Sequence, residues 1–210
     1  MVIDVNVAVF GATGGIGIEL VGQALGLGHS VTAFVRDPAR LANRGDGLTI
    51  VTGDARDPAD VARAVRGQDA VLCALGTSDL KQTTLRATGT ANIIRAMEQE
   101  GVRRLIVVSA MGIGASWTSL SLFNRLFFAT VLRSARADHE AQEAAVTASG
   151  LDWTIVRPSG LVNTPGTGVY DVGENVRATT SRIPRADVAH LILKELADCA
   201  LIHRAVTITT

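Results

Sequence analysis

Apolar runs rich in β-branched residues alternate with helical patterns along almost the whole chain. Several of these runs are continuously apolar, which is typical of parallel strands that are covered on both faces. We expect strands over residues 5–10, 30–35, 48–51, 70–75, 105–108, 153–156 and 205–208. Helical patterns fill the intervals, at residues 15–27, 58–65, 85–99, 137–149 and 186–196.

Capping residues agree with this division of the chain. Thr84 is a candidate N-cap, Gly101 a candidate C-terminal glycine, and Pro58 stands at a first helical position. A strand followed by a helix, repeated, produces right-handed crossovers and a doubly wound α/β fold with a parallel sheet. We expect the strand order 3-2-1-4-5-6, with the last strand beyond, in a single domain over residues 1–210.

The composition excludes several classes of protein. Apolar residues make up 47% of the chain and charged residues 19%, which favours a folded globular protein over disorder. The net charge is zero and the basic residues are scattered, so no nucleic-acid-binding face is expected. Cys73 and Cys199 offer neither a disulfide framework nor metal-ligand spacing, and we expect no metal.

The chain shows no pattern for secretion or for a membrane span. Asp4 interrupts the N-terminal apolar run, which has no basic start. The most lipid-like stretch, residues 120–132, contains Asn124 and Arg125 and is too short to cross a bilayer. We therefore expect a cytoplasmic protein without a membrane partner, either a monomer or a small homo-oligomer.

The stretch "GATGGIG" follows the first expected strand and opens the first expected helix. Gly11 permits a tight turn, Gly14 lets the backbone approach a ligand, and Gly17 allows the helix to pack close to the sheet. The amides of the helix N-terminus then face an anion such as a diphosphate, and Thr13 adds a hydroxyl donor. Ordinary turn glycines are the alternative, but the strand–turn–helix context favours a dinucleotide site.

The second expected strand ends in "FVRDPAR", where a site for NAD usually has an acidic residue. Arg36 and Arg40 stand there instead, and a guanidinium matches the 2′-phosphate of NADP(H). The alternative is that Arg36 is a surface residue paired with Asp37. We expect NADPH to be preferred over NADH.

Two later stretches follow the same cofactor path. Asp54, just past the third strand, is expected near the adenine, although capping of the next helix is an alternative role. Leu75, Gly76 and Thr77 end the fourth strand, beside the point where the strand order reverses. Gly76 in an ordinary turn is the competing interpretation.

The chain resembles the atypical short-chain dehydrogenase/reductase family, and within it the branch of NADPH-dependent flavin and biliverdin reductases. The matching stretches include "VFGATGGIG", "VTAFVRDPARL", "VVSA" and "DHEAQEAAVTASGLDWTIVRP", and they cover most of the chain up to Pro158. The resemblance implies a Rossmann fold with an NADP(H) site formed by Gly11, Thr13, Gly14, Gly15, Ile16, Arg36, Arg40, Asp54, Ala55, Leu75, Gly76, Thr77, Ser109 and Pro158. Ser159 departs from the pattern, because the flavin reductases carry a histidine there.

The proton donor usual in ketone reductases is missing. That donor is a tyrosine whose pKa is lowered by a lysine four residues later. The only tyrosine of this chain is Tyr170, and residue 174 is Glu174. Ser109 and His139 remain as catalytic candidates. The competing interpretations are a serine that satisfies the local backbone and a partly exposed helical histidine.

A site without a strong acid suits an acceptor whose conjugated ring spreads the charge of an added hydride. We expect NADPH-dependent reduction of a planar acceptor: free flavin such as FMN or riboflavin, a quinone or a biliverdin-like tetrapyrrole. Residues 111–134 are expected to form a lid over it, with an aromatic wall of Trp117, Phe123, Phe127 and Phe128. Core packing or a subunit contact is the competing interpretation of these aromatic residues. Two alternatives stay open: a non-catalytic NADP(H) sensor, and an epimerase or isomerase of the same fold.

Overall fold

The structure is a computed structural model that describes residues 4–43, 45–76, 84–113, 133–174, 176 and 182–210. Its strands are β1 (Asn6–Phe10), β2 (Ser30–Val35), β3 (Leu48–Thr52), β4 (Ala70–Cys73), β5 (Arg104–Val108), β6 (Asp152–Pro158), β7 (Gly160–Val162), β8 (Asp171–Gly173), β9 (Arg182–Pro184) and β10 (Arg204–Thr209). Its helices are α1 (Gly15–Gly26), the 3₁₀ helix η1 (Pro38–Arg40), α2 (Pro58–Val65), α3 (Leu85–Glu100), α5 (Arg133–Ala148) and α6 (Arg185–Asp198).

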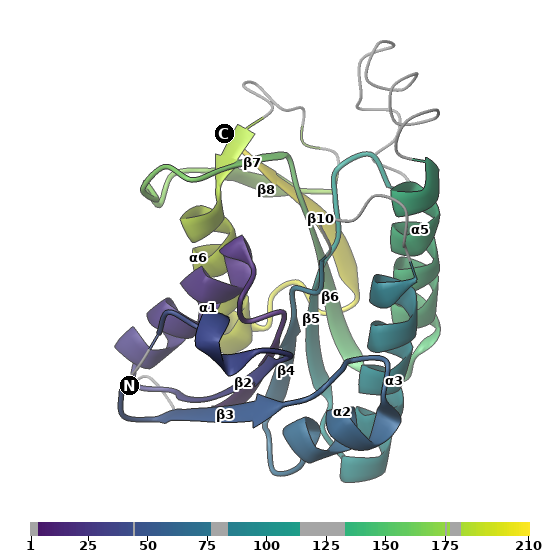
Figure 1. The fold of residues 1–210 in the computed structure, drawn as a ribbon. Helices are drawn as coiled ribbons and strands as arrows, with labels where there is room; N and C mark the ends of the chain where they lie inside the picture. Colours follow the sequence, from purple (N-terminus) through teal and green to yellow (C-terminus); the bar gives the residue numbers. More distant parts are fainter. Residues whose placement is uncertain (1–3, 44, 77–83, 114–132, 175, 177–181) are drawn as a thin grey trace.

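The main sheet has the order β3-β2-β1-β4-β5-β6-β10-β8 (Figure 1). All its pairs are parallel except β10 with β8, which is antiparallel. The expected doubly wound order 3-2-1-4-5-6 is confirmed, and the last expected strand is β10, beside β6. The short β8 and the small parallel pair of β7 with β9 were not expected, because three residues are too few to show a period.

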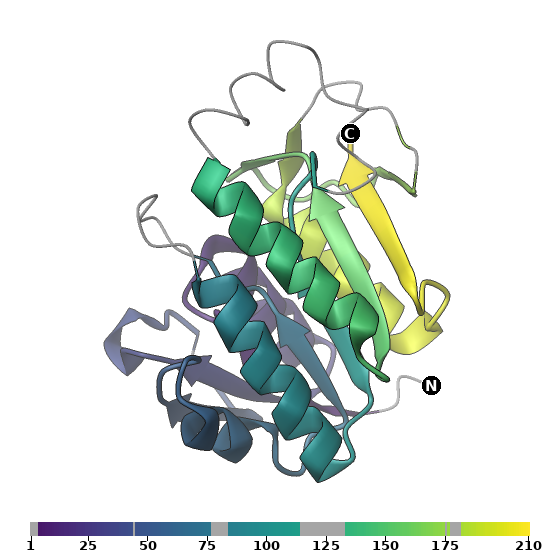
Figure 2. The same ribbon diagram turned by 90° about the vertical axis from the view of Figure 1, so that its right-hand side faces the viewer.

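Helices cover both faces of the sheet. Figures 1 and 2 show α1 and α6 on one face and α2, α3 and α5 on the other. Alternate residues of β1 supply the two cores: Val7 and Val9 belong to the cluster on the α1–α6 side, and Ala8 and Phe10 to the other. This arrangement explains the continuously apolar run of β1, since each side chain is covered by one helical layer or the other.

Apart from the start of the fifth helix, the sequence-based boundaries lie within two residues of those in the structure. The fourth strand was expected to reach residue 75 but ends at Cys73, and residues 74–76 leave the sheet toward α3. The fifth helix begins at Arg133, four positions earlier than expected. Within the described residues, no helix combines the length and the apolar character that a bilayer crossing requires. Most of the expected lid, including its four aromatic residues, lies outside the described residues.

Candidate functional site

The glycine-rich turn after β1 is shaped by backbone contacts that leave no space for side chains. Gly11 has a φ of +83°, and a Cβ on it would overlap the carbonyl oxygen of Ala74, which follows β4. A Cβ on Gly17 would overlap the carbonyl oxygen of Gly11. The turn closes with a hydrogen bond of 2.9 Å from the Gly14 amide to the Gly11 carbonyl. The first and third glycines of the motif are therefore required by packing of the turn itself.

The N-terminus of α1 opens from this turn. Its N-cap is Gly14, which has no side chain to accept hydrogen bonds from the first-turn amides, and the first turn has no acidic residue. Gly14 and Gly15 are exposed, so those amides are accessible to an anion. Thr13 is half-buried beside them, whereas Ile16 is buried in the core and offers only its main chain. The glycine-rich turn and the first-turn amides of α1 together, called the cradle below, fit the diphosphate of a dinucleotide.

Arg185, which the sequence patterns did not single out, lies over the same helix end. A Cβ on Gly15 would lie 2.5 Å from both Cδ and Nε of Arg185, so the arginine crosses the first turn of α1. Its Nη1 donates a hydrogen bond of 2.6 Å to Oδ1 of Asn163. Arg185 therefore places a cation beside the N-terminus of α1. The only sequence signal was an arginine at the start of a helix, which is common on protein surfaces.

Arg36 follows β2 and Arg40 ends η1, and both side chains are exposed. Neither guanidinium group makes a hydrogen bond or an ion pair with another described residue. The alternative pairing of Arg36 with Asp37 is not observed. Oδ1 of Asp37 instead accepts a hydrogen bond of 3.0 Å from the Ala39 amide and caps η1. Both guanidinium groups are therefore available to a phosphate at the carboxyl end of β2.

Asp54 lies past the end of β3 and is bound by Arg56, with a closest approach of 2.6 Å between Nη2 and Oδ2. Hydrogen bonds from Arg56 lower the pKa of Asp54 to about 2, against a smaller opposing effect of burial. The charge of Arg36 also contributes to the lowering, which places the ends of β2 and β3 within electrostatic range. The alternative that Asp54 caps α2 is wrong, because Asp57 is the N-cap.

The residues after β4 line the point where the strand order reverses. Leu75 is half-buried and Gly76 is exposed, while Thr77 lies outside the described residues. Ala55 is buried beneath them, and its carbonyl accepts a hydrogen bond of 3.0 Å from Nδ2 of Asn92. A Cβ on Gly76 would lie 3.7 Å from Nη2 of Arg86, so this glycine faces a cation from the start of α3.

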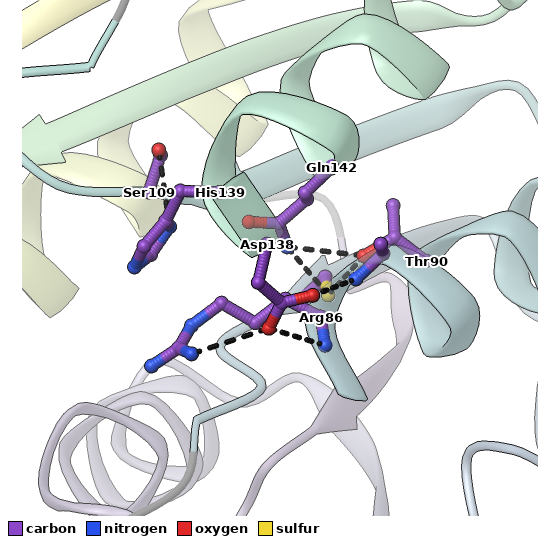
Figure 3. Close-up of polar contacts among 8 residues, drawn as sticks. Arg86, Thr90, Ser109, Asp138, His139 and Gln142 are labelled. Atoms are coloured by element: carbon purple, nitrogen blue, oxygen red, sulfur yellow. Dashed lines mark hydrogen bonds and ion pairs between the residues drawn. The ribbon is translucent and has the colours of Figure 1, made fainter. Parts of the chain in front are cut away.

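Ser109 and His139, the two catalytic candidates, lie together (Figure 3). Ser109 follows β5 and is 6% exposed, and its Oγ is 3.3 Å from Nδ1 of His139 on α5. The alternative that the serine only satisfies local backbone is therefore not observed. His139 is half-buried. Burial and the charge of Arg86 lower its pKa to about 4, although a hydrogen bond with Gln142 opposes the change.

Neighbouring side chains fix α5, and with it His139. Asp138 accepts hydrogen bonds from the amides of Arg86 (3.2 Å) and Ala87 (2.9 Å), so it caps α3 from another helix. Arg157 of β6 and Glu143 of α5 form a buried two-pronged ion pair of 2.9 Å and 2.6 Å. Sequence reasoning missed these contacts because their partners are far apart along the chain.

We predict that His139 is neutral at physiological pH, because burial and the charge of Arg86 both disfavour the imidazolium. The unfolded chain, with an ordinary histidine pKa of about 6.5, binds more protons below that pH. The stability supplied by neutral His139 is thus complete above pH 6.5 and is lost as the pH falls toward 4. An NMR titration, with the signal assigned through His139→Gln, should give a pKa near 4; a value at or above 6.5 would contradict the prediction.

Tyr170 contacts α6 rather than the Ser109–His139 pair. Its hydroxyl lies 2.7 Å from Nδ1 of His190 on α6, and its ring packs against the core of the α1–α6 side. Pro158 is the buried last residue of β6, and the buried Ser159 follows it. The only tyrosine of the chain is thus bound to another helix and is not available as a proton donor beside Ser109.

The chain belongs to the NAD(P)H-binding family, whose pattern it matches over residues 11–199. It is 29% identical over 211 residues to the uncharacterized sugar epimerase YhfK of Bacillus subtilis, covering 97% of this chain and 94% of that protein. It is 34% identical over 177 residues to an uncharacterized chloroplastic protein of Arabidopsis thaliana, covering 78% of this chain and 61% of that protein.

Two further similarities concern reductases. The chain is 32% identical over 152 residues to the (4-alkanoyl-5-oxo-2,5-dihydrofuran-3-yl)methyl phosphate reductase of Streptomyces griseus, covering 72% of this chain and 46% of that protein. Among solved structures, the anaerobillin reductase ChuY of Escherichia coli O157:H7 superposes with a TM-score of 0.82. It is 26% identical and the match covers 97% of this chain and 96% of that one. The fold and the glycine-rich cradle are thus those of an NAD(P)H-binding protein with reductases among its relatives.

Proposed function

We propose that the protein is an NADPH-dependent reductase that transfers hydride to a planar conjugated acceptor such as a free flavin, a quinone or a tetrapyrrole. One observation carries this proposal. The glycine-rich turn follows β1 and the Ser109–His139 pair follows β5, so both lie past the carboxyl ends of parallel strands, while the only tyrosine is bound to His190 on α6. A dinucleotide site without a tyrosine–lysine donor suits an acceptor that needs little acid assistance.

Different residues would bind the two phosphate-bearing parts of the dinucleotide. The first-turn amides of α1 would hold the diphosphate, with the nearby Arg185 adding positive charge. Arg36 and Arg40 would hold the 2′-phosphate, since a guanidinium forms charge-assisted hydrogen bonds with phosphate oxygens. When bound, NADPH supplies the hydride. These residues orient it and contribute no acid or base.

The acceptor would lie beside Ser109 and His139, which would donate or accept hydrogen bonds that position it. A histidine with a pKa of about 4 carries almost no proton to give at neutral pH, so His139 is a poor general acid. A flavin, quinone or tetrapyrrole ring spreads the incoming negative charge over several heteroatoms, and water then supplies the proton. The Ser109 hydroxyl, only 6% exposed, would bond the nicotinamide amide or a ring heteroatom.

The reductases among the similar proteins support the choice of acceptor. The name of ChuY describes a reductase of anaerobillin, and that of the Streptomyces protein a reductase of an oxo-dihydrofuran ring that bears a phosphate. The name of YhfK instead favours a sugar epimerase. An epimerase needs a positioned acid or base at the substrate carbon, and the neutral His139 does not provide a strong one. A sensor that binds NADP(H) without turnover is the remaining alternative.

A steady-state assay tests the proposal. Consumption of NADPH should depend on added FMN, riboflavin or quinone. Binding of NADPH without turnover would instead favour the alternative of a non-catalytic NADP(H) sensor.

We predict that Ser109→Ala keeps at least about a tenth of the flavin reductase activity, because one neutral hydrogen bond contributes only about 0.5–1.5 kcal/mol. Ser149→Ala is the matched control, since Oγ of Ser149 donates a local hydrogen bond to the Val146 carbonyl near the end of α5. Complete inactivity of Ser109→Ala would mean that its hydroxyl takes part in the chemistry.

A further inference from the structure

Arg86 is a cation at the start of α3 that is not among the groups proposed above to bind the dinucleotide. It lies in the first turn of α3, and its side chain is 13% exposed. Its Nη1 is 3.4 Å from Oδ2 of Asp138, and its Nη2 is 3.7 Å from the position that a Cβ on Gly76 would take. Figure 3 shows the pair of Arg86 with Asp138 near the pair of Ser109 with His139.

The positive charge of Arg86 is only partly compensated. The Asp138 carboxylate is shared, because it also accepts hydrogen bonds from the amides of Arg86 and Ala87. It takes the place of an N-cap side chain, since Thr84 at the N-cap position makes no such bond. The buried Nε of Arg86 has no hydrogen-bond partner among the described residues. A buried guanidinium with an unused donor is costly unless a ligand completes its hydrogen bonds.

Other groups are proposed to hold the phosphates of the dinucleotide. The diphosphate is expected at the start of α1, where Arg185 supplies a nearby cation, and the 2′-phosphate at Arg36 and Arg40. Arg86 is instead close enough to His139 for its charge to lower the pKa of that imidazole. Because the Arg86–Asp138 pair also lies near the Ser109–His139 pair (Figure 3), we assign the unused donor to the acceptor that Ser109 and His139 would contact.

We propose that Arg86 binds an acidic group of the acceptor, a phosphate or a carboxylate, so that the preferred substrates are planar conjugated rings that carry an anion. This inference rests on the proposed reductase function and narrows its substrate class. A guanidinium can form two parallel hydrogen bonds to either anion, which would fix the orientation of the ring as well as attract it.

FMN and riboflavin provide the test, because they share one ring system and differ by a phosphate. The unchanged protein should show a kcat/KM for FMN roughly tenfold above that for riboflavin. Arg86→Met should remove most of that preference while leaving riboflavin reduction within about twofold, and Arg86→Lys, which keeps the charge without the forked geometry, should lie between them. Arg95→Met is the matched control, since Arg95 is exposed on the same helix.

Binding measurements keep the inference testable apart from turnover. Calorimetry on the NADP⁺-loaded protein should give weaker FMN binding in Arg86→Met than in the unchanged protein, with riboflavin binding unaffected. In an NMR titration, FMN should raise the pKa of His139 in the unchanged protein, because an anion on Arg86 offsets its charge, and should do so much less in Arg86→Met. Arg86→Lys serves both measurements if the methionine variant unfolds.

Two results would overturn the inference. One is equal kcat/KM for FMN and riboflavin in the unchanged protein. The other is a loss in Arg86→Met that appears as a higher KM for NADPH with both flavins, which would assign Arg86 to the dinucleotide. If neither flavin is reduced but FMN binding still depends on Arg86, the reductase proposal fails and the anion site stands.

Discussion

Gly17→Ala is expected to abolish NADP(H) binding, with a dissociation constant beyond about 1 mM. A Cβ at this position would overlap the carbonyl oxygen of Gly11 and lie 2.8 Å from Cα of Ala12. Both obstacles are backbone, and Gly11 is itself held against the carbonyl of Ala74, so no flexible side chain can move aside. The first turn of α1 must then shift away from the glycine-rich turn. This shift would displace the amides that are expected to face the diphosphate.

Calorimetry with NADPH measures this loss, and thermal unfolding reports the accompanying cost in stability, which we expect to be about 1–3 kcal/mol. Gly26→Ala is the matched control in the same helix, because nothing lies within 4 Å of the Cβ that it would gain. That variant should bind NADPH normally and gain about 0.4–1 kcal/mol of stability from the smaller entropy of its unfolded chain. Retention of micromolar binding by a folded Gly17→Ala protein would mean that the dinucleotide is held elsewhere.

Arg36→Ala is expected to weaken NADPH binding about 10- to 100-fold while changing NADH binding by no more than about twofold. Arg36 is exposed at the end of β2 and pairs with no other described residue, so its removal breaks no internal contact there. The loss therefore measures charge-assisted hydrogen bonds to the 2′-phosphate, which NADH lacks. Titration of both reduced dinucleotides, followed by fluorescence or calorimetry, gives the two constants.

The titrations of Arg36→Ala with NADPH and NADH need a control variant that removes one positive charge away from the end of β2. Arg95→Ala does so on an exposed part of α3 and should leave both affinities unchanged. Raising the salt concentration should weaken NADPH binding more than NADH binding in the unchanged protein, since ionic interactions are screened. Equal losses for the two dinucleotides in Arg36→Ala would refute the phosphate assignment.

Local patterns of the sequence were sufficient to predict the strand order and the glycine-rich turn. The apolar run of β1 predicts a strand covered on both faces, because such a run is stable only when both sides are buried. The spacing of Gly11, Gly14 and Gly17 predicts a turn that a helix closes tightly, since close backbone approach requires glycine. The single tyrosine, followed by Glu174 four residues later, excludes the tyrosine–lysine donor from the sequence alone. Each of these conclusions depends on residues near one another in the chain.

Only the tertiary structure showed which polar groups meet around the site. Asp138 caps a helix that begins about fifty residues earlier, and Arg185 crosses a turn of α1 at Gly15. The sequence offers acidic and basic residues at these positions but no pattern for their pairing, because a long-range contact depends on the distance between elements once they are packed. For the same reason the sequence left open whether Ser109 and His139 touch, and Arg86 received no role until the packing of α3 against α5 placed its charge beside them.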